Sequence, residues 1–355
     1  MENRGLDRRT VIDCIPIKME KVEFELEHKH CTHCGRSFHA RPPGVMPKCL
    51  YGNQLFTHVA IQHYIHGNPL GQLERQTGIG YSSLVDAMHQ LARHLKGVPE
   101  KIIQEYRKAA VKHADETGWR SDGQNGYGWI FCTPDSSIFR FRRSRSAHIV
   151  REVLGEESLP GVLVVDRYSA YNKARCAIQY CYAHLLRGVK DIEQEFPDNA
   201  EIHNFVETFG LLLSQAIHLR TLNLSDREFK RHAEEIKTKI ISAVHQEARH
   251  PAIQSIQTIF REKAERLYHW AEDPHIPADN NLAERELRPL VIARKVSFGS
   301  QSERGAETRG ILMTILHTLR KRTPDVAVAF KRGLDKLAEN PSLDPYVALF
   351  ELNSS

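Results

Sequence analysis

The sequence lacks the features of a membrane or secreted protein. No apolar run approaches the roughly 18 residues that a membrane-spanning helix needs. The opening residues, MENRGLDRRT, lack the apolar centre of a secretory signal. Seven cysteines in 355 residues are too few for a disulfide scaffold. We therefore expect a protein of the reducing cytoplasm that has no membrane partner.

The sequence also lacks a strong net charge and the polar bias of a disordered chain. Its formal charge is only +5, and 41% of its residues are hydrophobic, which is enough to build a substantial core. The length suggests two or three modules. Basic residues gather in two stretches, Arg140, Arg142, Arg143, Arg145 and Arg151 in one and Arg309, Arg320, Lys321, Arg322, Lys331 and Arg332 in the other. Such patches suit a polyanion, although scattered surface charge explains them equally well.

A second Cys-x-x-Cys pair is missing from the N-terminal region. Cys31 and Cys34 have the spacing of a zinc knuckle, but a structural zinc needs four ligands. The remaining candidates do not stand at zinc-ribbon spacing; they are Cys14, Cys49, His30 and His39. We expect clearly less than one tightly held zinc ion per chain.

The stretch from Pro69 to Leu95 predicts two helices around the glycine turn Gly78-Ile79-Gly80. Apolar residues recur at helical spacing on both sides of that turn, and Ser82 or Ser83 can cap the second helix. This layout is typical of a helix-turn-helix, whose second helix enters the major groove of DNA. An ordinary helical hairpin has the same spacing, so both interpretations stay open.

The middle of the chain predicts an α/β sheet with carboxylates at strand ends. Residues 108–119 indicate a strand that ends in Asp115 and Glu116, and a hairpin follows over 126–143. The unbroken apolar run of residues 162–165 is typical of a strand buried on both faces, and it stops at Asp166. Residues at the carboxyl ends of such strands line ligand crevices. Asp166 could bind a cation there or accept hydrogen bonds from the amides around Tyr168.

A third carboxylate, Glu284, lies in the segment ADNNLAERELRP. Locally, Asn281 and Glu284 have capping-box spacing, and Glu284 and Arg288 could form a solvated ion pair. Alternatively, Glu284 could join Asp115 and Asp166. Three converging carboxylates repel one another unless divalent cations neutralise them, and Mg²⁺ prefers such oxygen ligands. Two such ions can clamp the attacking and leaving oxygens of a phosphodiester displacement.

Four motifs occur in an order that resembles the insertion sequence 66 family of bacterial transposases. They are HADET, VVDRYSAY, CYAHLLR and ADNNLAERELRPLVIARKVSFGSQSERGAE. The resemblance implies a ribonuclease H-like mixed sheet of the retroviral-integrase type, interrupted by a helical insertion. It identifies Asp115, Asp166 and Glu284 as the metal-binding catalytic triad of a DDE enzyme, with Mg²⁺ as cofactor and Mn²⁺ as a substitute.

The resemblance also implies a domain order and several secondary site residues. We expect a partial zinc-finger-like region at 1–52, a helix-turn-helix-like region at 53–104, the catalytic core at 105–190 and 276–300, the helical insertion at 191–275, and a C-terminal helical region at 301–355. Cys181 and His184 match a Cys-x-x-His element, which we interpret as structural, at the rim of the active site. Residues that could neutralise DNA phosphates are Arg187, Arg288, Arg294 and Lys295.

The function implied is cleavage of DNA at transposon ends followed by strand transfer into target DNA. The partners would be both DNAs, a second copy of the chain and accessory proteins of the same element. Two alternatives remain: a structure-selective nuclease on the same core, and a non-catalytic DNA-binding remnant. Family members usually carry an earlier cysteine pair and a longer N-terminal region with coiled-coil character, and neither is found in this sequence.

Overall fold

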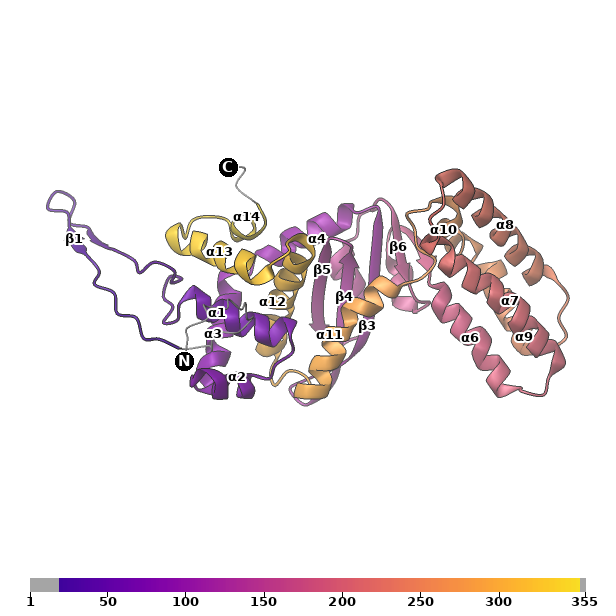
Figure 1. The fold of residues 1–355 in the computed structure, drawn as a ribbon, viewed down its shortest axis with the longest axis horizontal. Coiled ribbons are helices and arrows are strands. Elements are labelled where there is room, and N and C mark those ends of the chain that lie inside the picture. The colour runs from indigo at the N-terminus through magenta and orange to yellow at the C-terminus, as the bar shows by residue number, and fades with distance from the viewer. Residues whose placement is uncertain (1–18, 352–355) are drawn as a thin grey trace, which may run out of the picture.

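The computed structural model describes residues 19–351, and its centre is a five-stranded mixed sheet in the order β5-β4-β3-β6-β7. The strands are β3 (Val111–Ser121), β4 (Gln124–Thr133), β5 (Ser136–Arg142), β6 (Val162–Val165) and β7 (Ala177–Tyr180). β3, β4 and β5 form an antiparallel meander, whereas β6 and β7 run parallel to β3. An α/β fold with a mixed sheet is therefore confirmed. Helices flank the sheet at both ends (Figure 1).

Strand β3 is longer than its sequence predicts. Asp115 and Glu116 do not end it, because the strand continues to Ser121 and pairs with β4 along its whole second half. The predicted strand end was therefore wrong. Only the pairing with β6 stops early, at His113 opposite Val164, so one side of β3 lacks a neighbouring strand from Asp115 onward. The side chains of Asn280 and Arg294 bond to this edge of β3, at the carbonyls of Ala114 and Gly118.

Two long helices cover the sheet near β3, β4 and β5. Helix α11 (Asn281–Ser297) packs against β3 and β4, and α12 (Glu303–Arg322) packs along β5. The hydroxyl of Thr314 accepts a hydrogen bond from the Phe139 amide at 2.9 Å, and that of Thr318 accepts one from Ser137 at 3.1 Å. Gly310, one turn earlier, allows close approach, since a Cβ there would lie 3.2 Å from the Phe139 carbonyl oxygen. A helix thus occupies the place of a sixth strand at this edge.

The N-terminal helices form a compact group beside α12. They are α1 (Asn53–Ala60), the π-helix η1 (Ile61–Ile65), α2 (Leu70–Thr77), α3 (Tyr81–His94) and α4 (Val98–Lys108). The two predicted helices around Gly78 are confirmed as α2 and α3, and Gly78 adopts the left-handed conformation expected of a helix-ending glycine. Neither serine caps α3: its N-cap is Gly80, without a side-chain hydrogen bond.

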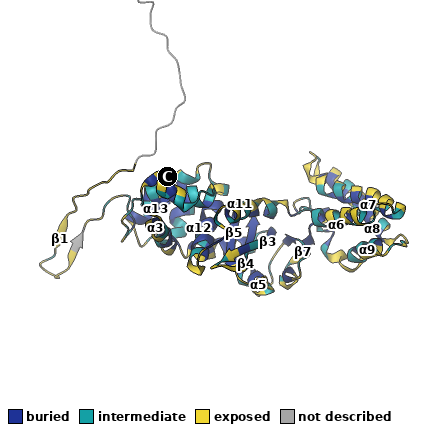
Figure 2. Cartoon of the chain, turned by 90° about the horizontal axis from the view of Figure 1, so that it is seen from below, coloured by how far each residue is buried: buried dark blue, intermediate teal, exposed yellow. Residues whose placement is uncertain are grey.

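A separate helical region follows β7 and lies beyond the far end of the sheet (Figure 1). It contains α6 (Tyr182–Glu195), α7 (Ala200–His218), η3 (Leu219–Thr221), α8 (Asp226–His245), α9 (Pro251–Glu262), η4 (Ala264–Arg266) and α10 (His269–Glu272). Its helices pack mainly on each other. The strands of the sheet are largely buried, whereas these helices expose one face each (Figure 2). The chain returns to the sheet through α11.

The remaining elements are short or peripheral. They are the hairpin β1 (His28–His30) and β2 (Ser37–His39), α5 (Ala147–Leu154), η2 (Ser169–Lys173), α13 (Val326–Glu339) and α14 (Pro345–Phe350). Within the described residues, no helix combines the length and apolarity needed to cross a bilayer.

Candidate active site

The register of the sheet brings Asp115 and Asp166 to the same level. β3 and β6 pair in parallel with Val111 opposite Val162 and His113 opposite Val164. The same offset, continued for two residues, sets Asp115 opposite Asp166, which directly follows β6. Both carboxylates therefore lie at the place where β6 ends and β3 continues alone. The backbone amide of Tyr168 donates to Asp166 Oδ1 at 2.9 Å, as one of the two interpretations of Asp166 predicts.

Asp115 occupies a site that disfavours its charged form. Burial raises the pKa of Asp115 to about 8, although a hydrogen bond from the Glu116 amide opposes the shift. The charges of Glu116, Asp166 and Glu284 raise this pKa further. Like charges affect a pKa strongly only at short range. These carboxylates therefore lie near enough to affect one another's charge, but among the described residues Asp115 and Asp166 do not belong to any group of three potential metal ligands whose atoms lie within 4.8 Å of one another.

Glu116 has hydrogen-bond partners of its own on the other face of β3, away from Asp115. Its side chain, only 1% exposed, accepts hydrogen bonds from Arg145 at 2.6 Å and from the Tyr171 hydroxyl. The Arg145 guanidinium also stacks over the Tyr168 ring at 3.9 Å. Because adjacent strand residues point to opposite faces, Glu116 is satisfied without turning toward Asp115 and Asp166.

Helix α11 begins at the site and is held there by Asn280. The Asn280 side chain donates to the Ala114 carbonyl at 2.8 Å and contacts His113 Nδ1 at 2.9 Å. The predicted capping box was wrong, because the N-cap is Asn280 rather than Asn281 and makes no side-chain cap. Asn280 instead connects the helix to β3, a contact between residues too far apart in sequence for local patterns to indicate.

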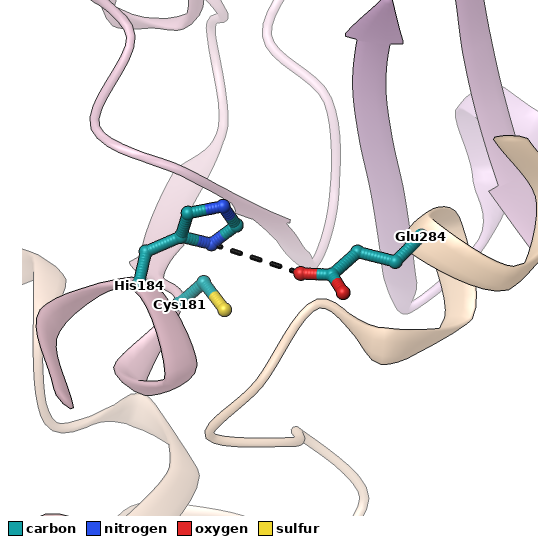
Figure 3. A group of neighbouring side chains, drawn as sticks. All are labelled: Cys181, His184 and Glu284. Atoms are coloured by element: carbon teal, nitrogen blue, oxygen red, sulfur yellow. Dashed lines mark ion pairs between the residues drawn. The ribbon is translucent and has the colours of Figure 1, made fainter. Parts of the chain in front are cut away.

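Glu284, in the first turn of α11, faces Cys181 and His184 at the start of α6 (Figure 3). Ligand atoms of these three residues lie within 4.8 Å of one another, and His184 Nδ1 is 3.8 Å from Glu284 Oε1. Both of those atoms are buried without a hydrogen-bond partner. No ion pair between Glu284 and Arg288 forms in the described part of the chain. The Glu284 carboxylate is thus left available to a ligand.

Cys181 is buried at the N-terminus of α6. Its sulfur accepts a hydrogen bond from the Asn280 amide at 3.1 Å, and burial raises the pKa of the thiol to about 11. The Cys181 amide in turn donates to the Val165 carbonyl at 2.8 Å. Cys181 therefore connects β6, α6 and the start of α11. These contacts agree with a structural role at the rim, where His184 adds a potential metal ligand.

The four basic residues predicted to contact DNA occupy different positions. Arg187 is exposed on α6, and Arg288 is exposed on α11, one turn beyond Glu284. Arg294 donates to the Gly118 carbonyl at 2.7 Å and thus fastens α11 to β3. Lys295, its neighbour, is exposed. Their roles in binding DNA stay predictions.

Most of the first arginine cluster is paired with glutamates. The pairs are Arg140 with Glu100 at 3.0 Å, Arg142 with Glu152, Arg143 with Glu303 at 2.7 Å, and Arg145 with Glu116 at 2.6 Å. The partners come from four separate elements or loops, so the sequence could not indicate them. Much of the positive charge of this cluster is therefore paired within the protein, and the interpretation as a polyanion patch stays a prediction.

Cys31 and Cys34 lie in the turn between β1 and β2. Hydrogen bonds between the two residues lower the pKa of Cys31, as in a knuckle turn. Among the described residues, this pair is not part of any group of three potential metal ligands. The side chain of His39 and all of Cys14 lie outside the described residues. The zinc prediction is therefore untested.

Comparison with known proteins identifies the family. Two proteins of Sinorhizobium fredii (strain NBRC 101917 / NGR234), both described as uncharacterized, are similar to this chain. Protein y4qI is 24% identical over 392 residues, covering 98% of this chain and 71% of its own length. Protein y4jD is 22% identical over 240 residues, covering 61% of this chain and 42% of its own length. Residues 48–308 match the family described as "Transposase IS66 family". The chain belongs to the IS66 family of transposases.

Proposed function

We propose that this protein is a DDE transposase that cleaves DNA at transposon ends and joins the freed 3′ ends to target DNA. The proposal names Asp115, Asp166 and Glu284 as the metal ligands, and the observation that carries it is the strand register that sets Asp115 beside Asp166 where β6 ends. Strand register supports the first two, and the shared electrostatic effect on Asp115 supports all three. The mixed sheet, with a meander followed by two parallel strands, supports a ribonuclease H-like core.

The residues present fit a divalent cation. Burial destabilises the charged form of Asp115 unless a cation lies beside it. Glu284 Oε1 is buried and has no hydrogen-bond partner. Carboxylate oxygens are the ligands that Mg²⁺ and Mn²⁺ prefer. In this proposal Asp115, Asp166 and Glu284 hold the ion. Its chemistry would be to stabilise charge on the phosphate and to lower the pKa of a bound water or hydroxyl.

The protein's own residues position these ligands. Asn280 fixes the distance between α11 and β3, so that Glu284 stays beside the strand that carries Asp115. The Tyr168 amide orients the Asp166 carboxylate. Glu116, engaged by Arg145 and Tyr171, is excluded from the ligand set. Such pre-arranged ligands need little reorganisation when substrate binds.

The DNA-binding role rests on the helical regions in this proposal. Helices α2 and α3 have the layout of a helix-turn-helix, and the exposed start of α3 at Tyr81 is free to approach a groove. If this segment recognises transposon ends, removal of residues 1–98 should reduce the preference for end sequences more than it reduces non-specific binding. Two copies of the chain on paired ends would complete the assembly.

The decisive experiment is a two-step assay with Mg²⁺ and the DNA that flanks the gene. Cleavage of a labelled end duplex followed by joining to a target plasmid supports the transposase. Cleavage without joining would identify the structure-selective nuclease. DNA binding without metal-dependent cleavage would identify the non-catalytic remnant.

A further inference from the structure

A cavity of about 250 Å³ lies beside α11, separate from the cluster of carboxylates. Residues of η1, α11 and α12 line it, and they include Arg285, Arg288, Arg309 and Arg320, which together we call the arginine pocket. Arg288 stands four residues after Glu284, or about 6 Å along the helix axis. The pocket therefore borders the proposed active site without sharing its carboxylates.

No carboxylate lines the arginine pocket, which is unusual for this protein. Arg140, Arg142, Arg143 and Arg145 all pair with glutamates, as does Arg322 with Glu105 at 2.6 Å. By contrast, none of the four pocket arginines forms an ion pair with any described carboxylate. Their positive charge is uncompensated by the protein.

Arg309 carries the strongest evidence because it is only 6% exposed. Its Nη2 donates to His63 Nε2 at 2.9 Å, while His63 Nδ1 donates to the Asn68 carbonyl at 2.7 Å. His63 is therefore a neutral acceptor. The guanidinium also lies over the rings of Tyr64 and Trp119, each 5.4 Å from the centroid. Arg309 is thus held firmly in place by groups that leave its charge intact.

Arg320 is also held by a histidine that accepts its hydrogen bond. Its Nη2 donates to His317 Nδ1 at 3.1 Å, and His317 Nε2 donates to the Tyr64 carbonyl at 3.1 Å. Two arginines in one cavity are thus positioned by neutral histidines where a carboxylate would be the usual partner. Arg320 is exposed to solvent, but Arg309 is buried, and a buried charge without a counter-ion costs stability, so the surroundings of Arg309 indicate a missing anion.

The walls of the pocket depart from regular helix geometry. η1 is a π-helix, a rare form that often marks functional sites, and it supplies His63 and Tyr64. Pro289 lies inside α11 and lacks the amide that would bond to Arg285, which weakens the helix at the cavity. Both irregularities face the pocket.

We propose that the arginine pocket binds a phosphate group of the DNA strand, at a position close to but distinct from the scissile phosphate. The proposal rests on the proposed function, since it names where that substrate is held. Guanidinium groups match phosphate in charge and geometry. The volume is below the range of about 300–1,000 Å³ for whole small-molecule ligands, which suits one phosphate with part of its nucleoside.

The test measures thermal unfolding of the full chain in EDTA, so that it does not depend on catalysis. Inorganic phosphate and a short single-stranded deoxyoligonucleotide are titrated separately. Both should raise Tm saturably, and the oligonucleotide should act at lower concentration. Arg309→Gln and Arg320→Gln should each weaken both ligands about tenfold or more, because a charge-assisted contact is lost. Arg332→Gln, at an exposed position on α13, should bind as the wild type does.

A second readout separates ligand binding from a structural role. Without ligand, Arg309→Gln should melt at the same or a higher temperature, since it removes an uncompensated buried charge. A lower Tm together with unchanged ligand binding would overturn the proposal, as would equal binding by wild type and both variants. Stabilisation by inorganic phosphate but not by the oligonucleotide would overturn the assignment to DNA. Asp115→Asn should retain phosphate and oligonucleotide binding while it loses cleavage, so an Asp115→Asn variant that still cleaves would count against the proposed catalysis and not against the arginine pocket.

Discussion

The sheet with α11 and α12 differs from the helical region α7–α10 in how its polar groups are satisfied. In the helices the partners are local: Asn199 caps α7, and Ser225 and Glu228 form a capping box on α8. Around the sheet the partners are distant: Asn280 bonds to Ala114, and Thr314 bonds to Phe139. A polar substitution should therefore act locally in the first region and across the fold in the second.

The largest expected effect concerns the three carboxylates. Asp115→Asn, Asp166→Asn and Glu284→Gln should each reduce cleavage of a labelled end duplex by about a thousandfold or more, because an anionic metal ligand is lost while shape is kept. Circular dichroism should show an unchanged fold. Glu235→Gln, which breaks an exposed pair with Lys239 on α8, is the matched control and should cleave normally. A cleavage-competent Glu284→Gln would remove Glu284 from the site.

The second prediction concerns how the free energy of unfolding depends on pH through two buried histidines, His63 on η1 and His317 on α12. Burial lowers the pKa of His63 to about 3 and that of His317 to about 4, so both are neutral in the folded protein. The unfolded chain binds protons at these positions below about pH 6.5, so stability is complete above that value and falls as the pH drops toward 4. We expect a loss of about 2 to 4 kcal/mol between pH 6.5 and pH 5 in denaturant unfolding. Stability that is flat over this window would contradict the neutral histidines.

The third prediction compares two asparagines. Asn280→Ala should lower the free energy of unfolding by about 2–3 kcal/mol, because it leaves the buried Ala114 carbonyl and His113 without their partner. Asn199→Ala removes only a helix cap and should cost about 1 kcal/mol. Chemical denaturation of both variants measures the difference. Equal losses would mean that the two regions do not differ in this respect.

The smallest effect on activity is expected at Glu286, which resembles Glu284 chemically but points elsewhere. Its side chain accepts from Ser137 at 2.7 Å and lies 3.4 Å from Lys321. Glu286→Gln should keep most cleavage activity per folded molecule while lowering the midpoint of unfolding, since Lys321 loses its buried partner. Loss of cleavage in a stably folded Glu286→Gln would show that the third carboxylate had been assigned to the wrong residue.

The local elements could be predicted from sequence, and the contacts between them could not. Alternation located the hairpin of β4 and β5, and helical spacing located α2 and α3, because these patterns depend on neighbouring residues. The extent of β3 was missed because charged residues at Asp115 and Glu116 suggest a strand end, whereas pairing with β4 carries the strand onward.

The candidate site shows the same division. Asp115, Asp166 and Glu284 were chosen from their motifs, and the structure brings them into one electrostatic environment. Asn281 and Glu284 were predicted to form a capping box, but the helix begins after Asn280, whose side chain bonds to β3 instead. The sequence drew attention to Arg288, Arg309 and Arg320 separately, but not to their convergence in one pocket, because Arg309 and His63 are brought together from distant parts of the chain and share no motif.

The threonine hydroxyls that α12 presents to β5 have a consequence for how the protein is made. β5 leaves the ribosome long before α12, so its outer edge has no hydrogen-bond partner while the intervening helices are synthesised. An open strand edge of this kind can pair with the same edge of a neighbouring nascent chain. Chains that stop before Thr314 and Thr318 should therefore form aggregates by edge pairing, whereas completion of α12 closes the edge and releases a monomeric sheet.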